Sequence, residues 1–390
     1  MDSSPTNHST TLIKIIPHRV WITLAGVILC IVMIFTSNIT LEGNQELNLF
    51  TVQRARVLAV EDDRLSPDPF VENLHIGRQT LELELLTGAH AGQRVRIDNT
   101  LSRFFNIRGQ ENMTLLVSVV TDDTGTIAHL DVFGYARDSF IYGFVGLFFL
   151  ILILVARKKG LYAVISLIFT LTAIVFFMIP GILQGESPIL LATVTAAFTA
   201  TFSILMIGDI SFKSLAAIGG TVVGVAIAGV VGVIAGNISH ISGMHIAHAE
   251  EVIFQAGQVP IRVPELLFAG IIISTLGAVI DVGMSISSAV FEIKDLNREI
   301  SMKQLYKSGM NIGRDIMGTM SNTLILAFAG SSITVLIIMV SYQLPYMRLI
   351  NLDILAVEII QGISASIGLV LAVPVTALVA AWLAAGRSKN

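Results

Sequence analysis

An aspartate inside an apolar segment is the residue of this chain whose position most strongly indicates chemistry. Asp281 interrupts the run LLFAGIIISTLGAVIDVGMSISSAVFEI, where glycines and serines surround it. A carboxyl group at membrane depth is costly, so it normally faces the interior of a helical bundle or a water-filled cavity. We expect Asp281 to couple to protons or cations. A structural hydrogen bond to neighbouring serines, or a position at the cytoplasmic boundary, are the alternatives.

Four other polar residues are candidates for the surroundings of Asp281. Ser285 follows one helical turn later, Asn322 and Thr323 open the next apolar segment, and Glu358 lies in the last one. Glu358 is a second carboxyl group within an apolar segment and therefore a candidate partner.

A charged connection, residues 289–320, joins the segment of Asp281 to the next apolar segment. Apolar residues recur among its charges, a pattern typical of one or two amphipathic helices lying in the cytoplasmic interface. The connection is either a plain linker or a mechanical coupling element in which Arg314 and Asp315 pair with neighbours.

Glycines and histidines form two further candidate sites. The pairs Gly220/Gly224 and Gly232/Gly236 have the small-xxx-small spacing that lets helices approach closely, and Gly277 is a further candidate packing glycine. Close packing is the simpler interpretation, and a sliding surface is the alternative.

The loop that follows the glycine-rich segment carries three histidines, His240, His245 and His248, with two glutamates nearby. These residues suit a site for a divalent metal ion or a pH sensor, and an ordinary polar loop is the simpler interpretation.

Composition places these residues in a polytopic membrane protein. Of 390 residues, 54% are hydrophobic and 13% are charged, whereas a soluble domain has about 25% charged residues. A nucleic-acid partner has no support. The lone Cys30 excludes a disulfide framework. Because P-loop, GxSxG and HExxH signatures are absent, we expect neither an enzyme nor a cofactor.

Apolar runs of membrane length predict about eight transmembrane helices, near residues 20–35, 139–156, 161–180, 188–207, 214–235, 266–287, 322–342 and 354–384. The expected organisation is a cytoplasmic segment (1–19), an anchor (20–37), an extracytoplasmic domain (44–137) and a seven-helix membrane domain (138–386). Basic residues gather in loops on one side of this arrangement. Both termini are therefore expected to be cytoplasmic and the 44–137 domain to lie outside.

The extracytoplasmic domain has the pattern of a small all-β fold. Five short runs separated by turn residues predict strands over 51–60, 80–86, 93–97, 115–120 and 127–133. In the second strand, leucines at 81, 83 and 85 alternate with glutamates, as expected where one face of a sheet is buried. We expect a small barrel-like domain.

Three stretches resemble the YibE/F family of bacterial membrane proteins. They are GAVIDVGMSISSA, SGMNIGRDIMGTMSNTLILAFAGSS and, in the β domain, the spacing of Thr87, Gly88, His90, Gly92, Val95, Ile97 and Asn99. The resemblance implies the architecture of a multi-pass protein of the bacterial plasma membrane and no specific activity.

A second resemblance implies transport. The order of a glycine, an aspartate four residues later, a charged connection with Ser308-Gly309, and Asn-Thr-Leu in the next span is similar to the permease repeat of resistance-nodulation-division transporters and of SecD and SecF. In that superfamily the corresponding aspartate takes part in proton movement, which would fall on Asp281. This chain departs from the pattern because its spans hold one such aspartate and no basic partner.

These observations together favour a secondary-transporter-like permease for an unknown small solute or ion, coupled to protons through Asp281. The alternative is a membrane scaffold or sensor whose β domain binds a ligand or a partner protein. The lipid bilayer is the expected environment, and the glycine-rich segment is compatible with a homo-oligomer.

Overall fold

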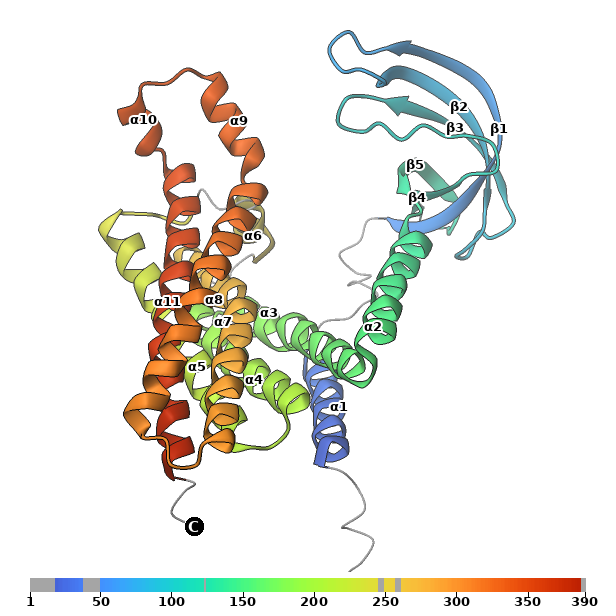
Figure 1. Cartoon of the computed structure of the whole chain (residues 1–390). Helices are drawn as coiled ribbons and strands as arrows, with labels where there is room; N and C mark the ends of the chain where they lie inside the picture. The colour runs from blue at the N-terminus through green and yellow to red at the C-terminus, as the bar shows by residue number, and fades with distance from the viewer. Residues whose placement is uncertain (1–17, 38–49, 123, 245–248, 257–260, 387–390) are drawn as a thin grey trace, which may run out of the picture. The chain divides into compact units, whose positions relative to one another are not determined.

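A computed structural model describes residues 18–37, 50–122, 124–244, 249–256 and 261–386. The chain divides into two compact units (Figure 1). One unit, residues 40–151, contains a β-sheet, and the other, residues 1–39 together with 152–390, contains a bundle of helices.

The sheet is built around one long strand. Its five strands are β1 (Thr51–Pro67), β2 (His75–Leu85), β3 (Arg94–Leu101), β4 (Thr114–Thr121) and β5 (Ile127–Tyr135). Their order is β3-β2-β1-β4-β5, and all neighbours are antiparallel. The 17-residue β1 has two partners, because residues 51–56 pair with β4 and residues 55–67 pair with β2. The five expected strands are confirmed, and β1 is longer than expected.

One face of the strongly curved sheet forms the core of this unit. Leu81, Leu83 and Leu85 are fully buried, while Glu82 and Glu84 between them are not, which confirms the expected alternation. The edge strands β3 and β5 carry no ladder between them, and a cleft of about 460 Å³ lies between these two strands. The sheet is therefore a half-barrel with one open seam.

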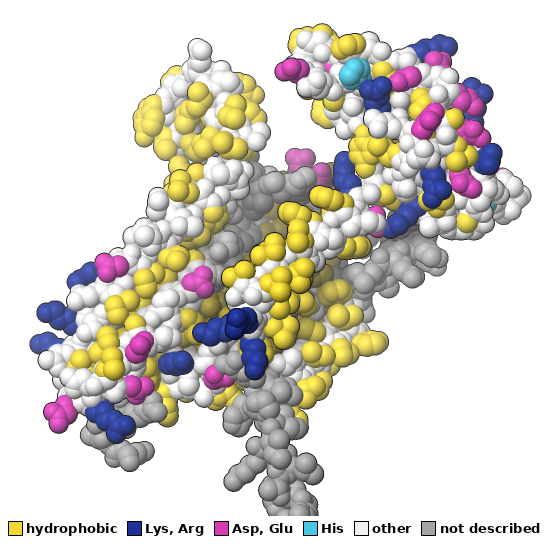
Figure 2. Space-filling view, turned by 45° about the vertical axis from the view of Figure 1, so that its right-hand side comes forward, with side chains coloured by type: hydrophobic (Ala, Val, Ile, Leu, Met, Phe, Trp, Pro, Cys, Tyr) yellow, Lys and Arg dark blue, Asp and Glu magenta, His cyan; other side chains and the backbone are white. Residues whose placement is uncertain are grey.

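The helices are α1 (His18–Thr36), α2 (Asp138–Ala173), the π-helix η1 (Ile174–Met178), α3 (Ile179–Leu183), α4 (Pro188–Gly208), α5 (Phe212–Ile238), α6 (Ala249–Ala256), α7 (Val263–Leu296), α8 (Met302–Ser331), α9 (Ile333–Ser341), α10 (Tyr346–Ile350) and α11 (Asp353–Gly386). Figure 2 shows charged side chains over the sheet unit and toward one end of the helical unit, whose remaining visible surface is mostly apolar.

The expected number of eight spans is not reproduced. Among the described residues, five helices are long and apolar enough to cross a membrane, or six if the bent pair α8 and α9 counts as one span. The first expected span falls short because its apolar helix covers Trp21–Thr36. The second and third form one run, Asp138–Leu183.

That long run contains a sharp break. Arg157 has φ 51°, so its backbone is not helical there. Just after it, a Cβ on Gly160 would lie 2.2 Å from the carbonyl oxygen of Leu152, which leaves room for glycine alone. The basic residues 157–159, expected in a loop between two spans, therefore mark the point where one helix ends and the next begins.

Helix α7 lies at the centre of the bundle and packs against α4, α5, α8 and α11. The tightest approach is between α5 and α11. A Cβ on Gly220 would lie 1.9 Å from Thr376 Oγ1, and one on Gly224 would lie 2.5 Å from Ala372 Cβ. Helices associate in membranes largely through such close contacts between small residues.

The other three candidate glycines divide into two groups. Gly232 and Gly236 are buried, and a Cβ there would lie 2.8 Å from Ile271 and 2.6 Å from Phe268, both on α7. Gly277 is exposed, and a Cβ there would meet nothing within 4 Å. Gly277 thus packs against no described residue.

We predict that Gly224→Ala destabilises the helical unit, whereas Gly219→Ala does not. The added methyl group at 224 would overlap Ala372, and overpacking of this kind costs about 1–3 kcal/mol. At Gly219 the nearest atom, Val379 Cγ1, is 3.9 Å away, and alanine favours a helix. The unfolding midpoint of both purified full-length variants in mixed detergent micelles gives the comparison. Equal midpoints would contradict the importance of this contact.

Candidate functional site

Asp281 lies on a polar face of α7 that other described helices leave uncovered. Ser274, Gly277, Asp281 and Ser285 recur every three or four residues and are all exposed, so they share one face of the helix. The Asp281 carboxyl forms no hydrogen bond or ion pair with any residue that the structure describes. The other side chains of α7 that face its neighbours are largely apolar and buried. This chain therefore leaves a carboxylate uncovered within a membrane-length helix.

Helices α4 and α8 flank this face. At 100° per residue, Met284 is offset from Asp281 by about 60° to one side and Ile286 by about 140° to the other. A Cβ on Gly208, the last residue of α4, would lie 2.8 Å from Met284, and one on Gly313 of α8 would lie 3.2 Å from Ile286. The polar face is thus a strip between two apolar contacts.

Asn322 and Thr323 lie near the level of Asp281 along the bundle. Helices α7 and α8 run antiparallel, and Ile286 of α7 lies beside Gly313 of α8. Asp281 precedes Ile286 by five residues, so it lies at about the level of the residue five positions after Gly313, residue 318. This level is roughly one helical turn from Asn322. Both α8 side chains are exposed, and Thr323 donates a hydrogen bond to its own helix, at Thr319 O. Asn322 and Thr323 therefore lie within roughly one helical turn of the level of Asp281 along the bundle, without a direct contact to its side chain.

Glu358, in contrast, lies far from Asp281. A Cβ on Gly224 would touch both Val279 of α7 and Ala372 of α11, so these two residues lie at one level. Glu358 precedes Ala372 by fourteen residues, which corresponds to about 21 Å along the helix. The structure therefore places the two carboxyl groups in separate environments.

The charged connection is continuous with the span that follows it. Ser301 and Gln304 form a capping box at the start of α8, and the helix then runs without interruption to Ser331. Arg314 and Asp315 are exposed within it, and Arg314 donates a hydrogen bond to Asn311 of the same helix. The two residues thus belong to the same rigid helix as Asn322 and Thr323.

Sequence reasoning missed the role of Lys294 in the turn before α8. Its side chain is buried, and Nζ donates to the carbonyl oxygens of Arg298 and Ile300 at 2.6 and 3.3 Å. The lysine thereby satisfies main-chain acceptors where α7 ends. In the sequence it looked like one of several solvent-facing basic residues.

The histidine-rich loop is described only in part. His240 is exposed at the end of α5, and His245 and His248 lie outside the described residues. Within the described ranges, no group of three or more His, Cys, Asp or Glu side chains is placed to hold a metal ion. The metal interpretation of this loop stays a prediction.

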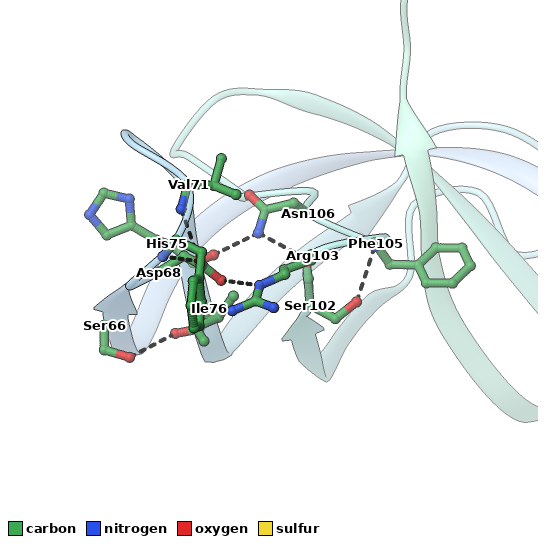
Figure 3. A network of polar contacts seen from close by, with 10 residues as sticks. Ser66, Asp68, Val71, His75, Ile76, Ser102, Arg103, Phe105 and Asn106 are labelled. Atoms are coloured by element: carbon green, nitrogen blue, oxygen red, sulfur yellow. Dashed lines mark hydrogen bonds and ion pairs between the residues drawn. The ribbon is translucent and has the colours of Figure 1, made fainter. Parts of the chain in front are cut away.

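A second polar centre, in the sheet unit, joins two loops through an ion pair between a buried aspartate and an exposed arginine (Figure 3). Arg103 Nε lies 2.6 Å from Asp68 Oδ2, and the Asp68 side chain is fully buried. Asp68 Oδ1 accepts hydrogen bonds from the amides of Phe70 and Val71 at 2.8 and 3.1 Å. The hydrogen bonds from Arg103 and from these two amides stabilise the ionised carboxylate more than burial destabilises it. The pKa of the Asp68 carboxyl is therefore below its ordinary value.

The two loops that this centre joins present exposed aromatic side chains. Asn106 Nδ2 donates to the carbonyl oxygens of His75 and Ser102, and so ties the two loops together. The side chains presented by the loops are strongly exposed, at 81% for Phe70 and 94% for Phe104. The stretch Ser66-Pro67-Asp68-Pro69 is typical of a turn or loop, but no local signal links Asp68 to a residue 35 positions later.

Comparison with known proteins gives one match. Residues 144–386 match the model of a family described as YibE/F-like protein. Neither the curated proteins nor the solved structures include a match to this chain.

We predict that the loop of Phe70 and Val71 loses protection from hydrogen exchange at low pH. The folded pKa of Asp68 is below its ordinary 3.8, so the ionised carboxylate stabilises the loop above that pH and less as pH falls through the folded pKa. In Asp68→Asn the protection of both amides should be low at every pH. Amide protection factors of the full-length protein, corrected for intrinsic exchange rates, test this. A wild-type loop equally protected at pH 2 and pH 6 would contradict it.

Proposed function

This chain belongs to the YibE/F-like family, and on that premise we propose that it is a secondary-transporter-like permease for a small solute or ion. Asp281 is its coupling carboxylate, which takes up and releases a proton or binds a cation. The observation that carries the proposal is the exposed polar face of α7 with Asp281 in its middle.

The exposed polar face of α7 is energetically costly within a membrane. A carboxylate in contact with lipid chains is strongly disfavoured, so a water-filled path or a second protein surface has to cover it. Ser274 and Ser285, one to two turns on either side, offer hydroxyl groups along the same strip, and Gly277 leaves open space beside Asp281. A strip of small and polar side chains supports a path for a polar solute better than a sealed structural contact.

The interrupted helices of this unit support the same proposal. Helices α8 and α9 meet at Ser332 with a bend of 62°, and η1 is a single π-helical segment between α2 and α3. Transporters commonly use discontinuous helices, and π-helical segments are frequent at functional sites. In this proposal Asn322 and Thr323 on α8 orient the solute or ion near Asp281.

The proposal includes a location and an orientation. Eight crossings of a bacterial plasma membrane, with α1 as the first, would place both termini in the cytoplasm and the sheet unit outside. Support comes from the basic residues, which lie in alternate connections of such an arrangement, for example at Arg157 and Arg298.

One observation favours the alternative role of a scaffold or sensor. Phe70 and Phe104 are strongly exposed on two loops that the ion pair of Asp68 with Arg103 joins. Exposed aromatic side chains are typical of protein-binding surfaces. In that case the sheet unit would recruit a partner, and the Asp281 face would be covered by a second copy of the chain.

For the permease role, we predict protein-dependent proton movement that Asp281→Asn abolishes. Proteoliposomes containing a pH-sensitive dye would be challenged with pH gradients and a panel of ions. Glu292→Gln is the matched control, since Glu292 lies eleven residues later and about 20° away on the same helix, beyond the apolar stretch. The control should keep the full response. No response from folded wild-type protein to any ion, or an unchanged response in Asp281→Asn, would contradict the coupling role.

For the orientation, we predict that a cysteine at position 111 reacts with a membrane-impermeant maleimide in intact cells and that one at 298 does not. Both Glu111 and Arg298 are exposed, and the substitutions are made in a Cys30→Ser background. After cell lysis both positions should react. Labelling of the 298 variant in intact cells would overturn the proposed topology.

A further inference from the structure

Asn322 lies on the outward side of α8. A Cβ on Gly313 of this helix would overlap Val373 of α11 and lie 3.2 Å from Ile286 of α7, so Gly313 faces the bundle. Asn322 follows nine residues later, which corresponds to a rotation of about 180°. Its side chain is exposed, and within the described ranges it forms no hydrogen bond. The amide therefore points away from the helices against which α8 packs.

This amide also lies at a depth where lipid offers no hydrogen bonds. The contact of Gly313 with Ile286 aligns α8 antiparallel to α7 and places Asn322 at about the level of Gly277. Gly277 lies about 16 Å along α7 from Leu266, where the apolar run begins, and the hydrocarbon core of a bilayer is about 30 Å thick. An amide near the middle of that core requires a hydrogen-bonding partner. The described part of this chain supplies none, so the partner is expected on a second polypeptide.

A second copy of the chain supplies polar groups at this depth. Copies with the same orientation in the membrane are related by an axis along the membrane normal, which keeps equal residues at equal depth. Asn322 of one copy is then level with Gly277 of the other, one helical turn from Asp281. Helices α7 and α8 are neighbours. One two-fold contact can therefore set α8 of each copy against α7 of the other.

The exposed face of α7 has the shape and polarity to receive the Asn322 side chain. A Cβ on Gly277 would meet nothing within 4 Å, which leaves space for a side chain from outside. Asp281 is exposed one turn later and can accept a hydrogen bond from an asparagine Nδ2. We propose that two copies of the chain pair through α7 and α8, with Asn322 of each copy beside Gly277 and Asp281 of the other.

This pairing deepens the proposed function and rests on it for the role of Asp281. The surroundings of Asp281 become a shared site, because the nearby Asn322 belongs to the other copy. Lipid chains on this face would leave both polar side chains without hydrogen bonds, which is costly. The glycines of α5 offer no competing surface, since Gly220 and Gly224 already lie against α11 of the same chain.

Disulfide cross-linking between two differently tagged copies tests the pairing. One copy carries Gly277→Cys and the other Asn322→Cys, both in a Cys30→Ser background, and native membranes are oxidised with copper phenanthroline. We expect a mixed disulfide that joins the two tags, because a disulfide requires Cα atoms within about 7 Å. Ala329→Cys is the matched control for Asn322→Cys. Ala329 is exposed on the same side of α8, about 20° away but about 10 Å farther along the helix.

The control pair should give only the background yield of disulfide. Equal yields for the two positions on α8, or no mixed disulfide with Asn322→Cys in folded protein, would overturn the pairing. Cross-linking of the expected pair without any proton movement by the wild type would support the pairing and contradict only the permease role.

Proton movement by mixed pairs tests the shared site. Asp281→Asn and Asn322→Ala should each lose the response when expressed alone. Co-expression should restore about a quarter of the wild-type response, because random assembly makes half of the pairs mixed and each mixed pair has one intact site. No restoration, or a full response from Asn322→Ala alone, would overturn the shared site.

Discussion

The close approach of α5 and α11 is the contact on which the rest of the helical unit depends. Inside a membrane, apolar side chains gain little by leaving lipid for protein, so helices associate through tight van der Waals contact. Gly220 and Gly224 supply that contact on one helix, and Gly368 supplies it on the other, where a Cβ would lie 2.5 Å from Ala228. With these two helices in contact, α7 packs against both of them, and one face of α7 remains exposed.

Both candidate sites of the helical unit lie where this packing stops. Asp281 lies on the remaining side of α7, between α4 and α8, and Glu358 lies where α8 bends away toward α9. In each place a carboxyl group lacks a partner among the described residues. A bundle built only for stability would place apolar residues at both positions.

Some of these features could be read from the sequence and others could not. The alternation of Leu81 with Glu82 predicted a half-buried strand, and the glycine spacing at 220 and 224 predicted close packing, because both patterns are local and periodic. The separation of Glu358 from Asp281 depends on the register between α7 and α11, which no single segment encodes. The pairing of Asp68 with Arg103 likewise depends on how two distant loops meet.

Helix continuity was the other feature beyond sequence reasoning. Charges at Arg314 and Asp315 suggested a separate interfacial element, yet the capping box at Ser301 starts a helix that continues through them into the apolar segment. At Arg157 the opposite holds, since the break is set by a backbone angle and by the contact of Gly160 with Leu152, which composition alone does not reveal.

The two partners of β1 also determine the order in which the sheet can assemble. Its second half faces β2 across a short connection, so this hairpin can form as soon as both strands have been synthesised. Its first half pairs with β4, and Thr51 hydrogen-bonds to a residue 68 positions later. That half stays without this partner until β4 emerges, and the sheet is complete only when β5, which pairs with β4, has followed it.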